Sequence, residues 1–325
     1  MSVDTARVPN GRGQPFWKQR KWESAIAFWV FMAPMLIGLT LFTFVPIVWG
    51  FLISLSEARN TVSISNFVGI DNYRDILRDD QFRRSLRTII IFTAFIVPLT
   101  FFFALMLAML VNTIGLGRAF FRSVFFIPTA ISYVVASLVW RMGIFNGLFY
   151  GVANTILYEW FNYQDTISWI SPRSNDPPYY WLVLVTLRLW LQVGFYMIIF
   201  IAGLQEIPKE LYDAAHVDGA RSGWRTFRDI TFPMLRNTSI AVLLLNFIAA
   251  FQAFDEFFNI FGSSGASGGN ASLARPPLIY LYQIGITNQN YGLASAGSFI
   301  VVALIVFVTL VQGRLLGFGR STANA

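Results

Sequence analysis

Charged and amide side chains that could do chemistry occur inside two long apolar stretches of the chain. In the first stretch Arg188 and Gln192 are four residues apart, which makes them neighbours on one face of a helix. Burying such groups among apolar residues is costly, so they indicate an ion pair, a solute contact or a proton relay. In the second stretch four polar residues recur at helical spacing and fall within one face about 100° wide: Gln252, Asp255, Glu256 and Asn259.

Most other chemistry is excluded by residues that the chain lacks. The sequence has no cysteine and one histidine, which excludes disulfides, thiol catalysis and clusters of histidine ligands. It has no Gly-x-x-x-x-Gly-Lys-Ser/Thr loop with which to hold nucleotide phosphates. The net charge of +7 is spread over short segments rather than one basic face, which argues against nucleic acid as a partner. We therefore predict no catalytic residue, no metal site and no cofactor.

The composition places the polar residues in a membrane protein. Of the 325 residues, 55% are hydrophobic and 13% are charged, whereas about 25% of the residues of a soluble domain are charged. Crossing a bilayer takes about 20 apolar residues. Six stretches meet this length and predict an all-α, polytopic protein with six transmembrane helices: 25–55, 86–111, 121–145, 179–204, 237–261 and 293–316.

The six predicted helices form one transmembrane domain at 25–318. The polar residues 1–24 contain no short apolar core followed by a small-residue cleavage site, so we expect an amino-terminal tail rather than a cleaved signal peptide. Residues 319–325 are expected to form a carboxyl-terminal tail. Pro34 and Pro46 predict a kink or tilt in the first helix.

The basic residues predict the orientation of this domain. With residues 1–24 in the cytoplasm, fourteen Lys and Arg residues lie in the inner segments and seven in the outer segments. Both termini and the loop 205–236 are therefore expected to be cytoplasmic. The segments 57–85, 146–178 and 262–292 are then outside.

The predicted orientation brings the intramembrane charges to one depth. Arg188 lies about eight residues and Asp255 about six residues from the outer ends of their helices. Since each residue advances about 1.5 Å along the helix axis, the two side chains lie at similar depths in the membrane. We expect Arg188 to pair with an acidic residue, with Asp255 as the first candidate and Glu256 as the second. An ion pair that fixes two helices, direct solute contact and a position near the outer surface remain open. Tyr196, in the middle of a predicted helix, is a further candidate for a solute cavity.

The stretch from 210 to 235 is charged and lies between two predicted transmembrane helices. Residues 210–217 are good helix formers, and Gly219 offers the positive φ at which a helix can end. Residues 224–230 can form a second short helix, and Pro233 can begin the next transmembrane helix. The simplest interpretation is a well-formed loop, and the alternative is a coupling element.

A resemblance favours the coupling element. The loop resembles the coupling loop of permeases of binding-protein-dependent ABC importers, whose signature is Glu-Ala-Ala, then Gly, then Ile-x-Leu-Pro. It departs from the signature by an Asp for Glu, a Phe for Leu and one extra residue before the Ile. The stretches "AGLQEIPKELYDAAHVDGA", "FVGIDNYRDIL" and "YGLASAGS" are similar to the carbohydrate-uptake subfamily. The matching residues are Asp213, Ala214, Ala215, Gly219, Ile230, Thr231, Phe232 and Pro233.

The resemblance implies the partners of the chain. Two permease subunits form the pathway, two cytoplasmic ATPase subunits bind the ATP and drive it, and an extracytoplasmic binding protein delivers the solute. In the family the first helix of the loop sits in a cleft on the ATPase, where Ala214 and Ala215 permit close approach. Asp213 and Asp218 can meet basic groups there, and Glu210 is a further coupling residue of the same helix.

The family places such a chain in the plasma (inner) membrane of a bacterium or archaeon, as a subunit that imports a sugar or related polyol by alternating access. The alternative from the residues alone is a secondary transporter in which Arg188, Asp255 and Glu256 couple transport to protons or ions. The coupling loop argues against this alternative. A membrane enzyme ranks third, because no nucleophile or metal set accompanies the carboxylates.

Overall fold

The protein is mainly helical in the residues that its computed structural model describes, which are 16–64, 66–147, 151–170, 178–219, 223–262 and 274–317. In this part of the chain, strand-like pairing is confined to two isolated bridges, between Ser56 and Phe67 and between Arg59 and Asn290. The prediction of an all-α protein is thus confirmed. The predicted tail at 319–325 lies outside the described residues. The first helix begins at Phe16, inside the segment predicted as a tail.

Five helical segments of the described chain are long and apolar enough to cross a membrane, and they coincide with five of the six predicted stretches. Two of them consist of more than one helix. The segments are Trp22–Ser54, within α1 (Phe16–Leu39), η1 (Thr40–Phe44) and α2 (Val45–Ser54); α4 (Asp80–Thr113); α8 (Tyr180–Gln205); Arg236–Phe261, with α12 (Arg236–Phe251) and α13 (Asp255–Phe261); and α15 (Tyr291–Leu316).

The sixth predicted stretch, 121–145, is broken rather than straight. Helices α5 (Arg118–Phe126) and η2 (Ile127–Ala130) form its first arm, and α6 (Tyr133–Leu138) and η3 (Val139–Ile144) form its second arm, at 89° to the first. Pro128 has no amide hydrogen and lies at the start of η2. Ser132 then adopts an extended backbone, and its side chain accepts a hydrogen bond from the Val134 amide at 3.3 Å, which caps α6. Six spans are present only if this bent pair counts as one.

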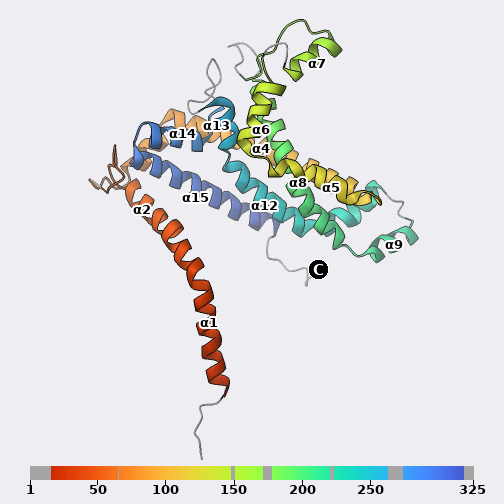
Figure 1. Ribbon diagram of the computed structural model, residues 1–325, viewed down its shortest axis with the longest axis horizontal. Helices are drawn as coiled ribbons and strands as arrows, with labels where there is room; N and C mark the ends of the chain where they lie inside the picture. Colours follow the sequence, from red (N-terminus) through yellow and green to blue (C-terminus); the bar gives the residue numbers. More distant parts are fainter. Residues whose placement is uncertain are drawn as a thin grey trace, which may run out of the picture.

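The first span stands apart from the other helices of this chain. Only 6% of its most apolar window is buried, and α1 extends well away from the bundle in Figure 1, where it is red. Contact with the bundle comes from α2, where the Phe51 ring meets Phe299 of α15 at a centroid distance of 5.5 Å. The π-helical turn η1 ends at Phe44, two residues before Pro46. In a regular α-helix the ring of Pro46 would clash with the carbonyl of Phe42, which lies within this turn.

The core lies mainly between α4 and α8. The fully buried side chains Phe92, Leu184 and Leu187 belong to one cluster there, which extends to α13. A second cluster joins the later turns of α4 and α8 to α12. Helix α5 crosses α8 at Gly194, where a Cβ atom would lie 1.9 Å from the carbonyl oxygen of Phe125. Only a glycine permits this close approach.

The helices alternate in direction, which gives the bundle two distinct ends. At the first, which we call the α9 end, α8 runs into α9 (Lys209–Val217), and Arg236 at the start of α12 donates from Nη2 to the Leu316 carbonyl oxygen at 3.2 Å. At the second, the α14 end, lie α3 (Asp71–Arg78), α7 (Val152–Phe161) and α14 (Pro277–Tyr282). Figure 1 shows α9 and α14 at opposite ends of the long helices.

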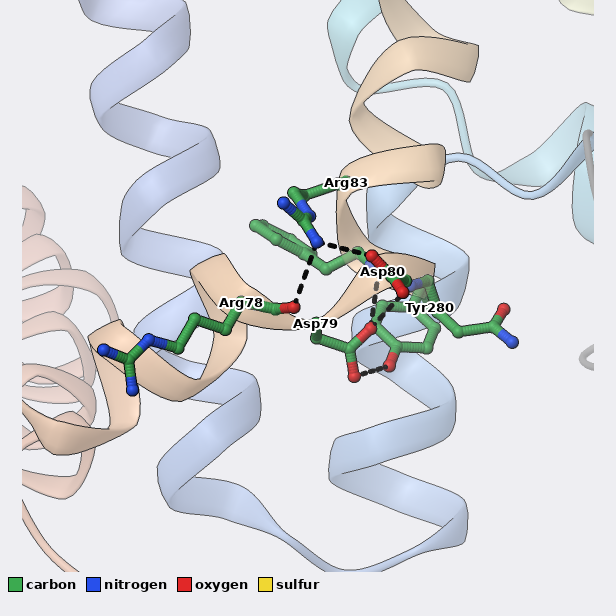
Figure 2. A network of polar contacts seen from close by, with 7 residues as sticks. Arg78, Asp79, Asp80, Arg83 and Tyr280 are labelled. Atoms are coloured by element: carbon green, nitrogen blue, oxygen red, sulfur yellow. Dashed lines mark hydrogen bonds and ion pairs between the residues drawn. The ribbon is translucent and has the colours of Figure 1, made fainter.

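Polar contacts fasten α14 to the start of α4 (Figure 2). The Asp79 carboxylate caps α4 by accepting hydrogen bonds from the amides of Gln81 and Phe82, at 2.7 and 2.9 Å. Its other oxygen accepts a hydrogen bond from the Tyr280 hydroxyl at 2.8 Å. Burial, together with this hydrogen bond to Asp79, raises the pKa of Tyr280 above its usual value. The guanidinium of Arg275 lies over the Tyr280 ring, 4.7 Å from its centroid.

Candidate functional site: an exposed loop helix and a buried ion pair

The loop between α8 and α12 begins with a short exposed helix. Pro208 precedes α9, and no residue of α9 is buried. The helix ends at Asp218, and Gly219 follows with a φ of +78°. A Cβ atom at Gly219 would meet no atom within 4 Å, so the backbone conformation, and not a lack of space, is what requires glycine. The predicted helix and its glycine stop are confirmed.

The second part of the loop is also helical but is built from short pieces. Helix α10 (Trp224–Thr226) continues into the π-helical turn η4 (Phe227–Thr231), which contains Ile230, and then into α11 (Phe232–Met234). Pro233 lies in α11 and not in the first turn of α12, because Leu235 separates the two helices. The prediction that Pro233 begins the transmembrane helix is therefore wrong by one short turn.

A hydrogen bond holds the two parts of the loop together. The hydroxyls of Tyr212 on α9 and Thr231 on η4 are 3.1 Å apart. Since η4 leads through α11 into α12, this hydrogen bond connects α9 to the segment that enters a membrane-spanning helix.

The loop residues singled out from the sequence are accessible. Among the described residues, none of the three carboxylates on or beside α9 takes part in an ion pair within the chain. Ala215 is half-buried, and Glu210, Asp213, Ala214, Asp218 and Gly219 are exposed. A helix with small residues and unpaired carboxylates on its surface suits contact with a basic partner protein.

Inside the bundle a buried ion pair joins α8 to α13. Arg188 donates from Nη1 to Oε1 of Glu256 at 2.6 Å, and the two side chains are 4% and 1% exposed. Arg188 also donates from Nη2 to the Ala249 carbonyl oxygen on α12, at 2.7 Å. An arginine paired with an acidic residue was predicted, but the partner is the second candidate, Glu256, and not Asp255.

The broken third span completes this site with Tyr133, which the sequence alone did not indicate. Its ring centroid lies 5.8 Å from the Arg188 guanidinium carbon, and its hydroxyl accepts a hydrogen bond from Gln192 Nε2 at 3.0 Å. Tyr133 is the first residue of α6, so the sharp bend brings it to α8. Pro128 and Ser132 are the residues of the apolar stretch 121–145 that could have indicated this bend.

The predicted polar face of the fifth span does not exist as one helix face. Helix α12 ends at Phe251, and α13 begins at Asp255 after Phe254, whose φ of −138° is not helical. The break changes the rotational relationship between residues on its two sides. As a result Gln252 and Asp255 are exposed, Asn259 is half-buried and donates to the Asp255 carbonyl oxygen at 2.7 Å, and Glu256 alone is buried.

The remaining candidate, Tyr196, is buried one turn below Gln192 and packs within the cluster that joins α4, α8 and α12. Two buried atoms beside the ion pair, Arg188 Nε and Gln192 Oε1, have no hydrogen-bond partner in the described part of the chain. The structure thus brings Arg188, Gln192 and Glu256 together. It separates them from the exposed group of Gln252 and Asp255.

Comparison with known proteins gives one consistent result. Residues 156–316 match the family described as binding-protein-dependent transport system inner membrane component. The sn-glycerol-3-phosphate transport system permease protein UgpA of Agrobacterium fabrum is 31% identical over 89% of this chain and 94% of its own length. The arabinooligosaccharides transport system permease protein AraP of Bacillus subtilis is 30% identical over 95% of each chain.

A solved structure has the same fold. A chain of a bacterial ABC transporter involved in the import of the acidic polysaccharide alginate superposes with a TM-score of 0.78, at 19% identity, covering 93% of this chain and all (100%) of that chain. The matched family segment contains the exposed loop helix and both halves of the buried ion pair. Similarity of sequence over nearly the whole length shows that the chain belongs to the binding-protein-dependent transport system inner membrane components, the permease subunits of ABC importers.

Proposed function

We propose that this permease forms half of the translocation pathway of an ATP-driven importer and is coupled to ATPase subunits through residues 210–233. The observation that carries this proposal is α9, a helix with no buried residue that sits at one end of the bundle and ends at the positive φ of Gly219. Because none of its residues is buried, the outward surface of this short helix is available for another protein to bind.

The loop transmits force in this proposal. Closure of the ATPase pair moves α9, and the Tyr212 to Thr231 contact passes the movement to η4 and α12. At the same end Arg236 ties the start of α12 to the end of α15. The two helices then tilt together, which is a rigid-body form of switching.

The solute in this proposal is a sugar or related polyol. Support comes from the names of the relatives, which refer to sn-glycerol-3-phosphate and arabinooligosaccharides. Gln252 and Asp255 are exposed and lie on either side of Phe254 in the sequence. The Phe254 ring forms a group with those of Phe258 and Tyr282, which contact one another at centroid distances of 5.1 to 5.7 Å. Hydrogen-bonding groups beside aromatic faces suit a carbohydrate.

The full assembly that we propose contains a second, homologous permease, two cytoplasmic ATPase subunits and an extracytoplasmic solute-binding protein. ATP is bound by the ATPase subunits, so this chain needs no cofactor. The chain crosses the plasma (inner) membrane, with the α9 end and both termini in the cytoplasm and the α14 end outside. The relatives lend no support to a secondary transporter, and Glu256 is held in an ion pair rather than free to relay protons.

The experiment is reconstitution of the permease pair with its ATPase and binding protein in vesicles. We expect ATP hydrolysis to rise when loaded binding protein is added, and sugar to accumulate inside only with ATP. Accumulation driven by a proton or sodium gradient without ATP would contradict the proposal.

A further inference from the structure

A groove runs along the outside of α4 and α8 at the α14 end. It consists of two adjoining hollows, of 340 and 430 Å³, that share Ile91, Pro178 and Trp181 as lining residues. The first hollow is also lined by Arg84 and Arg87, whereas the second continues between apolar side chains. One end of the groove is therefore cationic and the rest is apolar.

Within the residues that the structure describes, the two arginines at the mouth have no carboxylate partner. Both side chains are exposed, and in the described part of the chain neither forms an ion pair with a carboxylate. Arg83, next to them in sequence, does have one and donates to Asp80 at 2.5 Å. Two adjacent guanidinium groups without a counter-charge favour a bound anion, and their fork geometry matches phosphate oxygens.

The apolar part of the groove has the shape of a track. Ile91, Phe95 and Leu99 recur every four residues and line one side of α4 over about 12 Å. Leu182 and Val185 line the facing side of α8. Two of these side chains stand clear of the core, since Phe95 is 60% and Leu182 48% exposed. An extended hydrocarbon chain fits a track of this kind.

The cationic mouth lies at the level of a membrane surface. Trp181 is the second residue of α8, and its ring stacks on that of Phe92 with a centroid distance of 6.2 Å. Tryptophan is enriched where the hydrocarbon region meets the headgroups. Arg84 and Arg87 lie in the first two turns of α4, and their long side chains can extend toward the headgroups.

We propose that this groove binds an anionic phospholipid, with its phosphate on Arg84 and Arg87 and one acyl chain along Phe95, Leu99 and Val185. Two arginines lie beside an exposed apolar track at the membrane surface. A lipid can contact both features, whereas a soluble anion can contact only the arginines. The site is in the outer leaflet if the orientation proposed above holds. It is separate from the loop helix and from the buried ion pair.

The test is lipid retention by the purified permease complex, measured by native mass spectrometry after exchange into an equimolar mixture of phosphatidylglycerol and phosphatidylcholine. We expect the complex to retain phosphatidylglycerol preferentially. The double variant Arg84→Gln with Arg87→Gln should reduce this retention about tenfold. Arg78→Gln, which removes an exposed arginine at the same end of the bundle but outside the groove, should leave it unchanged.

Two further variants separate the headgroup from the acyl track. Arg84→Lys with Arg87→Lys keeps the charge and should preserve most of the preference, whereas Val185→Trp fills the track and should reduce retention of both lipids. If the Gln double variant fails to assemble, the lipid preference of the wild type and the lipid retention of Val185→Trp still test whether the groove binds an anionic phospholipid. Equal retention of the two lipids by the wild type would overturn the proposal. So would photocrosslinking of Phe95→Cys, labelled with a photoreactive maleimide, to another protein subunit.

Discussion

Arg188 on α8 holds both sides of the break in the fifth span at once. Its Nη1 donates to Glu256 on α13 at 2.6 Å, and its Nη2 donates to the Ala249 carbonyl oxygen on α12 at 2.7 Å. The three residues between α12 and α13 therefore form a bend that one guanidinium spans. One buried side chain thus binds to the helices on both sides of the break.

Arg188 and Glu256 should consequently be coupled in stability. Removing one partner of a buried ion pair leaves an unpaired charge, which costs about 3–5 kcal/mol. Arg188→Met and Glu256→Leu should each reduce the yield of folded complex and its melting temperature more than the double variant does. The matched control is Asp255→Leu, which removes the neighbouring exposed carboxylate and should have little effect. Additive losses for Arg188 and Glu256, or an Asp255 variant as damaging as the Glu256 variant, would argue against the pair.

Gly219 should tolerate asparagine but not valine. A branched side chain at a φ of +78° costs about 1–3 kcal/mol, and asparagine adopts this left-handed region far more readily. Because no atom lies within 4 Å of the place that a Cβ atom would occupy here, size alone should not matter. We expect Gly219→Val to insert normally but to weaken co-purification of the ATPase, with Gly219→Asn close to the wild type. Equal behaviour of the two variants would show that the left-handed turn is not what positions α9.

A reversed charge on α9 should weaken the contact with the ATPase. Asp213 is exposed and has no ion-pair partner among the described residues, so Asp213→Lys leaves the fold intact while presenting the wrong charge to a basic cleft. We expect binding of the ATPase subunit to fall about tenfold, with a parallel loss of transport-linked ATP hydrolysis. Asp75→Lys makes the same change on exposed α3 at the opposite end and serves as the control. Unchanged ATPase binding by the Asp213 variant would remove this carboxylate from the contact.

The two ends of the bundle should be reached from opposite sides of the membrane. The chain has no cysteine of its own, so single cysteines at highly exposed positions report accessibility without background. Val217 on α9 and Trp160 on α7 are 88% and 77% exposed. In intact cells stripped of their outer barrier, an impermeant thiol reagent should label Trp160→Cys and spare Val217→Cys. Labelling in the reverse pattern would invert the proposed orientation.

The contact between Tyr280 and Asp79 should make stability depend on pH in the alkaline range. Burial and this hydrogen bond raise the pKa of Tyr280 above its unfolded value of about 10, so the folded state favours the protonated hydroxyl. This contribution to stability is complete below pH of about 10 and is lost as the pH rises toward the raised pKa.

Tyr280→Phe should therefore destabilise the protein at pH 8 by about 1.5–3 kcal/mol, the contribution of a hydrogen bond to a charged group. The difference from the wild type should shrink above pH of about 10, as melting temperatures at pH 8 and 10.5 would reveal. The control is Tyr282→Phe in the same helix, whose hydroxyl makes no hydrogen bond within the described chain. A pH-independent difference would mean that the hydroxyl contributes only packing.

The sequence by itself determined which segments cross the membrane and what lies between α8 and α12. Both depend on local properties: spans need about 20 apolar residues, and the loop helix needs helix formers followed by a glycine. The all-α class, five of the six spans, α9 and the positive φ of Gly219 were accordingly predictable. So was the presence of a partner for Arg188, because an isolated buried charge is too costly.

Only the tertiary structure decided which acidic residue that partner is, and where Tyr133 and the lipid groove lie. Successive residues on a helix are rotated by about 100°, so a face can be assigned from spacing only while the helix stays continuous. The non-helical Phe254 interrupts this rotation between Gln252 and Asp255, and the bend at Ser132 does the same for the third span. Glu256 therefore faces Arg188 while Asp255 faces outward, because packing against α8, and not sequence spacing, sets the rotation of α13 after the break.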